Sequence, residues 1–190
     1  MNRFVVAACA MVVVLGSTTL LAQGRGRHGG GAPGGSNDTS IADFKLALAI
    51  QANQDQVAQF ESLSKSTTSA QKQAQDLQQK TASPVDPGDL VRLATVLKGS
   101  VDDAVSDSQN FLRDFSKLQK AQLKELTKKL EKSSADVAKE GKTLDQLLKA
   151  SKTDTSEFST SADRLQKALA DFRTRQLNLA DPMGIQPAPQ

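Results

Sequence analysis

The residue types that most often do chemistry are scarce in this sequence. His28 is the only histidine and Cys9 is the only cysteine among the 190 residues. A Ser-His-Asp triad needs a histidine beside its nucleophile, and a zinc site needs several thiolate or imidazole ligands close together. We therefore expect no catalytic site, no metal site and no bound cofactor, and we expect that the protein is not an enzyme.

Two weaker patterns also resemble reactive sites. Ser62-x-x-Lys65 and Ser69-x-x-Lys72 have the serine–lysine spacing of some acyl-transfer enzymes, but no S-D-N or K-T-G companion motif accompanies them. Four aspartates lie between residues 102 and 114, but oxygen-ligand cation sites usually need a loop with carbonyl ligands and a glycine turn. We interpret both patterns as solvated helix faces.

The charged residues are balanced overall but uneven locally. The formal charge is +3, and both signs are interspersed with no dense basic block next to aromatics, so we expect no nucleic-acid binding. Asp86–Asp114 holds three basic and six acidic residues, whereas Lys117–Lys132 holds six basic and two acidic residues. Such segments attract one another in an antiparallel pair or offer charged rims to a partner.

The first 22 residues have the three parts of a secretory signal peptide. Arg3 supplies the positive charge, an apolar run follows, and cleavage after Ala22 would leave Gln23 as the first residue of an exported chain. This pattern predicts a periplasmic or secreted protein with no stable membrane span after cleavage. Two alternatives stay open: lipid attachment at Cys9, which follows a lipobox-like Val6–Ala8, and retention of the apolar run as an uncleaved anchor.

Residues 23–38 are rich in glycine and lack large apolar side chains, which predicts a flexible leader. The stretch contains Gly24-x-Gly26-x-x-Gly29, the spacing of a dinucleotide-binding fingerprint. That motif works only between a strand and a helix, and no strand precedes it here. We therefore treat the match as chance.

Helical spacing dominates the chain after the leader. Apolar residues recur at steps of three and four from Ile41 onward, which predicts one helix from about residue 40 to about 81, capped at one of residues 37–39. In this register Asn53 and Thr67 take positions of the apolar stripe. No alternating run of β-branched or aromatic residues indicates a strand.

The stretch from Ser83 to Asp89 predicts a turn, because its two prolines push the preceding residues out of helical geometry. Asp86 as N-cap and Pro87 at the first helical position then begin a second helix, whose apolar stripe runs from Leu90 to Phe115. We expect a bend at Gly99-Ser100.

A chain reversal is expected between residues 130 and 156, most favourably in the polar run 151–156, with a last helix from about residue 156 to 179. Ser133-Ser134 and Gly141 are the other candidates for the reversal. Residues 181–190 read as a disordered tail. The sequence as a whole predicts an all-α fold: an elongated antiparallel helical bundle or coiled coil of three or four long helices over residues 39–180.

One motif points to a known family. The segment from Phe115 to Gln119 has the form of the LTxxQ motif, in which an apolar residue, a hydroxyl residue (Ser116) and a glutamine follow at fixed spacing. Ser116 would cap a helix whose first-turn Gln119 reaches back toward the cap. Ile50 to Gln54 forms a second, degenerate copy. Two copies in an exported, glutamine-rich chain resemble the Spy/CpxP family of periplasmic chaperones.

The resemblance implies an ATP-independent chaperone or stress adaptor, acting as a homodimer, whose amphiphilic helical surface binds unfolded or envelope proteins. The candidate client-binding residues beside the better motif copy are Lys117, Lys120, Lys124 and Lys128. A structural, envelope-associated coiled-coil protein is the alternative, because the long three-and-four register also suits assembly between chains. A metal sensor, a role also attached to this family, is disfavoured by the shortage of cysteine and histidine.

Overall fold

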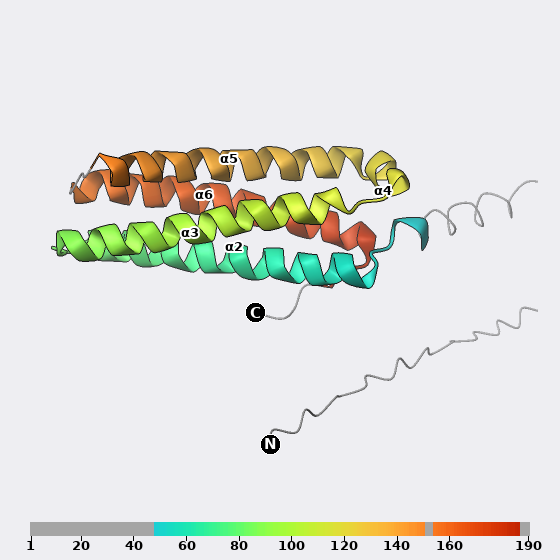
Figure 1. Cartoon of the computed structure of the whole chain (residues 1–190), viewed down its shortest axis with the longest axis horizontal. Coiled ribbons are helices and arrows are strands. Elements are labelled where there is room, and N and C mark those ends of the chain that lie inside the picture. Colours follow the sequence, from blue (N-terminus) through green and yellow to red (C-terminus); the bar gives the residue numbers. More distant parts are fainter. Residues whose placement is uncertain (1–47, 151–153, 187–190) are drawn as a thin grey trace, which may run out of the picture. The chain divides into compact units, whose positions relative to one another are not determined.

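Residues 48–150 and 154–186 are described by the structure, which is a computed structural model (Figure 1). They form the long helices α2 (Gln54–Thr81), α3 (Pro87–Arg113), α5 (Lys124–Lys149) and α6 (Thr155–Ala180), the short helix α4 (Lys117–Gln122) and the 3-10 turn η1 (Asp181–Met183). All of them belong to one compact unit. No strand occurs in the described residues, and the predicted all-α class is confirmed. The predicted signal peptide, leader and first N-cap lie outside these residues.

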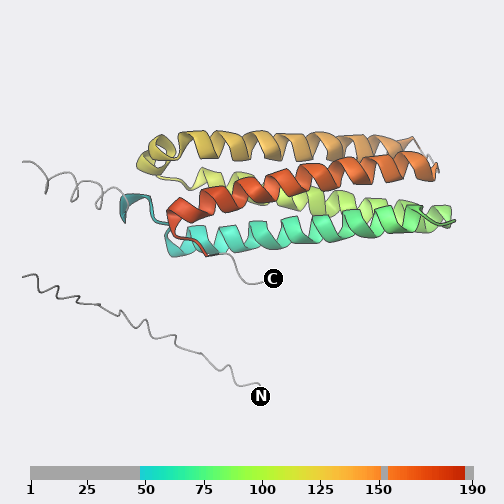
Figure 2. The same ribbon diagram turned by 180° about the vertical axis from the view of Figure 1, so that it is seen from behind.

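The long helices form an antiparallel four-helix bundle. Helix α2 packs against α3 and α6, and α5 packs against the same two helices, as Figure 1 and the reverse view in Figure 2 show. Side-chain contacts fix the antiparallel direction of α2 and α6, because Thr67 meets Gln176 and Gln78 meets Gln166. Successive helices therefore run up, down, up and down.

The predicted apolar stripes form the core of this bundle. Four phenylalanines that are at most 1% exposed, Phe60, Phe111, Phe158 and Phe172, are its largest members. Thr67 is also fully buried, as its register position predicted, and it accepts a hydrogen bond of 2.8 Å from Gln176 Nε2. The stripes are therefore buried by contacts within one chain.

The turn before α3 is confirmed in detail. Asp86 is the N-cap and its carboxylate accepts a 2.7 Å hydrogen bond from the Gly88 amide, with Pro87 at the first helical position. The helix then runs without interruption through Gly99-Ser100 to Arg113. The Ser100 hydroxyl lies 3.4 Å from the Ser69 hydroxyl of α2 and joins the two helices.

The prediction of one helix from residue 40 to 81 is wrong at its N-terminal part. Leu48–Ile50 are helical, the chain then breaks, and α2 begins only after Asn53. The Asn53 side chain caps α2 and does not occupy the apolar stripe. Asparagine is a strong N-cap residue, and this local preference outweighed the continuing apolar period.

The chain reverses at two places after α3. The favoured reversal in residues 151–156 is confirmed, because α5 ends at Lys149 and Asp154 caps α6 through a 2.9 Å bond from the Ser156 amide. The sequence missed the earlier reversal, in which α4 turns the chain between α3 and α5. Leu118 follows the α3 stripe in the sequence, but it lies on α4 and is 41% exposed, so it does not continue the buried stripe.

A further correction concerns the chain after α6. Residues 181–190 were predicted to form a disordered tail, but η1 continues the chain and the side chains of Met183 and Ile185 are at most 5% exposed. The Met183 carbonyl accepts a 3.0 Å hydrogen bond from the Ala52 amide. Two apolar residues were too few to give a periodic signal, yet they cover the end of the core.

Candidate functional site

The motif from Phe115 to Gln119 builds the beginning of α4. The Ser116 hydroxyl accepts a 3.1 Å hydrogen bond from the Gln119 amide, and Gln119 Oε1 accepts a 2.9 Å bond from the Ser116 amide. This reciprocal pair is a capping box, the geometry that the motif predicted. It fixes the turn that carries the chain from α3 toward α5.

A second capping box begins α2. Asn53 Oδ1 accepts a 2.8 Å bond from the Gln56 amide, and Gln56 Oε1 accepts a 3.1 Å bond from the Asn53 amide. The degenerate copy of the motif is therefore displaced by two residues from the predicted one. Gln54 is exposed on the first turn of α2, whereas Gln56 is 1% exposed and takes the position equivalent to Gln119.

The two capping boxes face each other at one end of the bundle. Gln56 Nε2 donates to Gln119 Oε1 at 3.1 Å, and Gln119 Nε2 donates to Gln56 Oε1 at 3.2 Å. Each amide also donates to a backbone carbonyl two residues before the other box: Gln56 to Asp114 at 3.2 Å, and Gln119 to Gln51 at 3.3 Å. Both buried amides are thereby fully hydrogen-bonded.

Apolar contacts support this amide pair. Phe115, the first residue of the motif, is 5% exposed and its ring meets Phe111 edge to face at 5.1 Å between centroids. Phe111 in turn lies 5.7 Å from Phe60 on α2. Ile50, the first residue of the predicted second copy, is partly buried, and its carbonyl accepts a 3.4 Å bond from Gln119 Nε2. The structure therefore brings Phe115, Ser116, Gln119 and Ile50 together and leaves Gln54 outside.

The lysines singled out from the sequence are exposed around the same turn. Lys117 and Lys120 lie on α4, and Lys124 and Lys128 lie on the first two turns of α5. We call these four residues the α4–α5 lysine group. Lys120 Nζ donates to the Arg113 carbonyl at 3.4 Å, and Lys128 lies 3.9 Å from Glu125. The ammonium groups are thus available to solvent.

Asp114 is the acidic neighbour of this group. Gln59 Nε2 donates to Asp114 Oδ2 at 2.6 Å. This hydrogen bond is the main reason why the pKa of Asp114 is lowered, and Arg113 and Lys120 add to it, while partial desolvation opposes it. In the described residues, the ion pairs along α3 and α5 join residues of the same helix, as Lys98–Asp102 and Lys128–Glu125 do. The attraction between the acidic and the basic segment is limited to the turn, where Lys120 helps to lower the pKa of Asp114.

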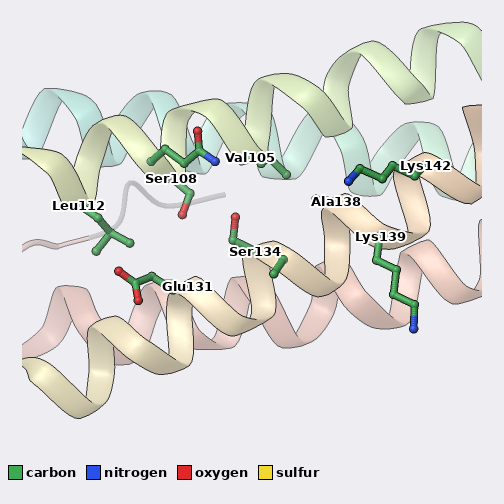
Figure 3. Close-up of a pocket in the computed structure, with 10 residues that line it drawn as sticks. Val105, Ser108, Leu112, Glu131, Ser134, Ala138, Lys139 and Lys142 are labelled. Carbon is green, nitrogen blue, oxygen red and sulfur yellow. The ribbon is translucent and has the colours of Figure 1, made fainter.

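A groove runs between α3 and α5 beyond the lysine group. Its cavity volume is about 420 Å³, and we call it the α3–α5 groove (Figure 3). It is lined by Val105, Ser108, Gln109, Leu112, Glu131, Ser134, Ala135, Ala138, Lys139 and Lys142. Apolar, hydroxyl and charged side chains therefore share one surface.

Small side chains explain why this groove stays open. Gly141 brings α5 close to α3, since an added Cβ would lie 2.8 Å from Val101 Cγ1. Toward the start of α5, the small side chains of Ala138 and Ser134, together with Ser108 of α3, leave the space between the same two helices unfilled. The Ser108 hydroxyl is buried and has no hydrogen-bond partner in the described part of the chain.

The patterns that resembled reactive sites have structural roles where they are described. Ser62 Oγ donates to Asp107 Oδ2 at 3.1 Å, and Ser69 accepts a bond from Gln73 at 3.3 Å. Within residues 48–150 and 154–186, no group of three or more His, Cys, Asp or Glu side chains could hold a metal ion. His28 and Cys9 lie outside the described residues.

Sequence reasoning missed Gln56, Ser108 and Ser134. Asn53-x-x-Gln56 is itself a capping-box signature, so Gln56 had a recognisable signal that the apolar register obscured. Ser108 and Ser134 had no recognisable signal in the sequence, because a serine in a helix is usually exposed to solvent.

No helix in the described part of the chain is long and apolar enough to cross a membrane.

Comparison with known proteins leaves the family open. No family model matches the chain, and no curated protein or solved structure matches it.

Proposed function

We propose that this protein is an exported, ATP-independent chaperone or stress adaptor that binds unfolded proteins through an amphiphilic helical surface. One observation carries the proposal: α5 presents exposed lysines and the α3–α5 groove on a single face. Lys124, Lys128, Glu131, Ala135, Ala138 and Lys142 follow at steps of four and three, so they form one stripe along the helix.

Such a stripe suits unfolded segments for two reasons. Exposed charges attract a client of opposite charge at long range and raise the rate of encounter. Apolar contacts at short range then retain segments that a folded protein would bury. Neither contribution requires a reaction or a nucleotide.

The two facing capping boxes support the resemblance to the Spy/CpxP family. The better motif copy forms one box, and Ala52–Gln56 supplies the other, with Asn53 in the position of the hydroxyl residue. The homodimer that the resemblance implies is part of the proposal, and a molar-mass measurement in solution tests it.

The structural coiled-coil alternative is less well supported. A coiled coil between chains needs an exposed apolar seam, and the long stripes here are buried inside one bundle. The exposed large apolar residues in the described part are Leu48, Val91, Val96, Leu118 and Leu177, which are spread over several elements.

Light scattering of a chemically unfolded client on dilution tests the function. We expect the protein to suppress client aggregation at near-stoichiometric ratio without nucleotide. A variant with Lys120, Lys124 and Lys128 changed to Gln should suppress less. The matched control changes Lys65, Lys72 and Lys80 of α2, which are also exposed, and should match the parent. Unchanged aggregation with the parent protein for several clients would refute the proposal.

A further inference from the structure

Two serine hydroxyls face the α3–α5 groove. Figure 3 shows the Ser108 and Ser134 side chains pointing into the space between the helices from opposite sides. Ser108 is 1% exposed and its hydroxyl has no hydrogen-bond partner in the described residues, while Ser134 is 6% exposed. Since burying a polar group without a partner is unfavourable, a ligand that hydrogen-bonds to Ser108 would recover that cost.

The size and walls of the groove suit a small ligand or a peptide segment. Its volume of about 420 Å³ falls in the range of about 300–1,000 Å³ that is usual for ligand sites. Val105, Leu112, Ala135 and Ala138 give it apolar walls on both helices. An occupant can therefore bury apolar side chains beside the two hydroxyls.

Opposite charges mark the two ends of the groove. Glu131 lies at the end near Leu112, and Lys142 lies at the other end with its side chain extending back along the groove (Figure 3). Neither of them has an ion-pair partner in the described part of the chain. An occupant with one acidic and one basic group would be complementary to both ends.

The separation of these two charges sets the length of the occupant. Glu131 and Lys142 are on one helix, and eleven residues at 1.5 Å per residue place their Cα atoms about 16 Å apart. An extended chain rises about 3.3 Å per residue and covers that distance in about five residues. We propose that the α3–α5 groove binds an extended peptide segment with an acidic and a basic side chain about five residues apart and apolar residues between them.

An extended peptide accounts for all three features. Its backbone amides can hydrogen-bond to Ser108 and Ser134, its apolar side chains contact the walls, and its charges meet Lys142 and Glu131. A fatty acid would pair only with Lys142 and would place its tail against Glu131. This inference rests on the proposed function, because segments of unfolded clients would be the natural occupants.

Fluorescence anisotropy of labelled synthetic peptides tests the proposal with the parent protein. The matched peptide carries Glu and Lys five positions apart with apolar residues between them and blocked ends. One control replaces both charges by Gln, and another brings Glu and Lys to two positions apart. We expect the matched peptide to bind about two- to fivefold more tightly than either control, the range for an exposed ion pair.

Variants of the groove locate the binding. Ala138→Phe fills the empty space and should abolish binding of the matched peptide, while circular dichroism checks that the bundle is retained. Lys142→Gln should reduce the preference for the charged peptide over its Gln control, because only Glu131 then remains to pair with a peptide charge. Lys72→Gln on α2 is the matched control and should leave binding unchanged.

The outcomes separate this inference from the proposed function. If the parent protein suppresses aggregation but all three peptides bind equally, or if Ala138→Phe binds like the parent, the inference is wrong and the function stands. Binding of dodecanoate in place of the matched peptide also overturns it. If the matched peptide binds in the groove but no client is protected from aggregation, the groove is a peptide site and the chaperone function is wrong.

Discussion

Gln56 and Gln119 hydrogen-bond to each other in both directions, and each also completes the capping box of its own helix. The pair joins the start of α2 to the turn between α3 and α5, which are more than 60 residues apart in the chain. A single contact thus ties the start of the first long helix to the reversal between α3 and α5.

Replacing either glutamine by Ala should destabilise the bundle by about 1–3 kcal/mol, because the remaining buried amide loses its partner. The double variant should cost less than the sum of the two, since the second substitution removes a group that is already unpaired. Urea unfolding followed by circular dichroism measures all three. Gln54→Ala is the matched control and should stay within about 0.5 kcal/mol of the parent. Strict additivity would contradict the reciprocal pair.

Phe111→Ala should be among the most destabilising single substitutions, at about 3–5 kcal/mol, because truncating a buried aromatic leaves a large void. The ring contacts both Phe60 and Phe115, so the void would open toward the amide pair as well. Thermal and urea unfolding measure the effect. Leu118→Ala removes an exposed side chain of α4 and provides the control. If Leu118→Ala lowered the free energy of unfolding as much as Phe111→Ala does, the assignment of the core would be contradicted.

The core could be predicted because its signal is periodic. Leu90, Leu97 and Phe111 lie on one face of a helix by spacing alone, and packing against other stripes is the only way to bury them. Polar residues carry no such signal. From the sequence alone, Asn53 fits both a position of the apolar stripe and an N-cap. In the structure it is the N-cap of α2, and the Gln56 of its capping box contacts Gln119.

The reversal at α4 shows a further limit. Leu123, Leu126 and Leu130 continue the helical spacing of α3 closely, so the periodicity gave no sign that the chain had turned. The capping signature at Ser116 did mark the start of a new helix, but a cap does not state in which direction the helix leaves. The groove depends on small residues of α3 and α5 that face one another. The spacing within one helix does not show which residues of another helix it will face.

Two glycines in the bundle should respond oppositely to alanine. At Gly141 an added Cβ would lie 2.8 Å from Val101 Cγ1, a stiff β-branched side chain, so Gly141→Ala should destabilise by about 1–3 kcal/mol. Gly99 has no atom within 4 Å of the added Cβ, and Gly99→Ala should stabilise α3 by about 0.5–1 kcal/mol through helix propensity. Unfolding measurements compare the two. Partial rescue of Gly141→Ala by Val101→Ala would confirm the close approach, and its failure would count against it.

The carboxyl group of Asp114 should titrate below its ordinary pKa of 3.8, chiefly because Gln59 donates to the carboxylate. A lowered pKa in the folded state means that ionisation favours folding above the ordinary value, and that this contribution is lost as the pH falls through the folded pKa. NMR titration of the side-chain carboxyl measures it. Gln59→Ala should raise the pKa of Asp114 toward 3.8, and an unchanged titration would show that Gln59 is not the cause.

The last prediction concerns the rate at which clients are captured. If the α4–α5 lysine group attracts clients, a net-negative unfolded client should associate fastest at low salt. The rate should fall as the screening length shrinks from about 30 Å at 0.01 M to about 8 Å at 0.15 M. Stopped-flow fluorescence with a labelled client across this salt series measures the dependence.

Changing Lys120, Lys124 and Lys128 to Gln should lower the low-salt rate and flatten its salt dependence. Helicity should hardly change, because exposed charges contribute little to folding. The α2 control with Lys65, Lys72 and Lys80 changed to Gln carries the same net charge, so it separates the local group from the overall charge. If both variants slow association equally, the net charge of the protein governs the encounter and the lysine group has no special role. If only the first variant slows it, clients arrive at the end of the bundle where α4 turns the chain, beside the entrance to the groove.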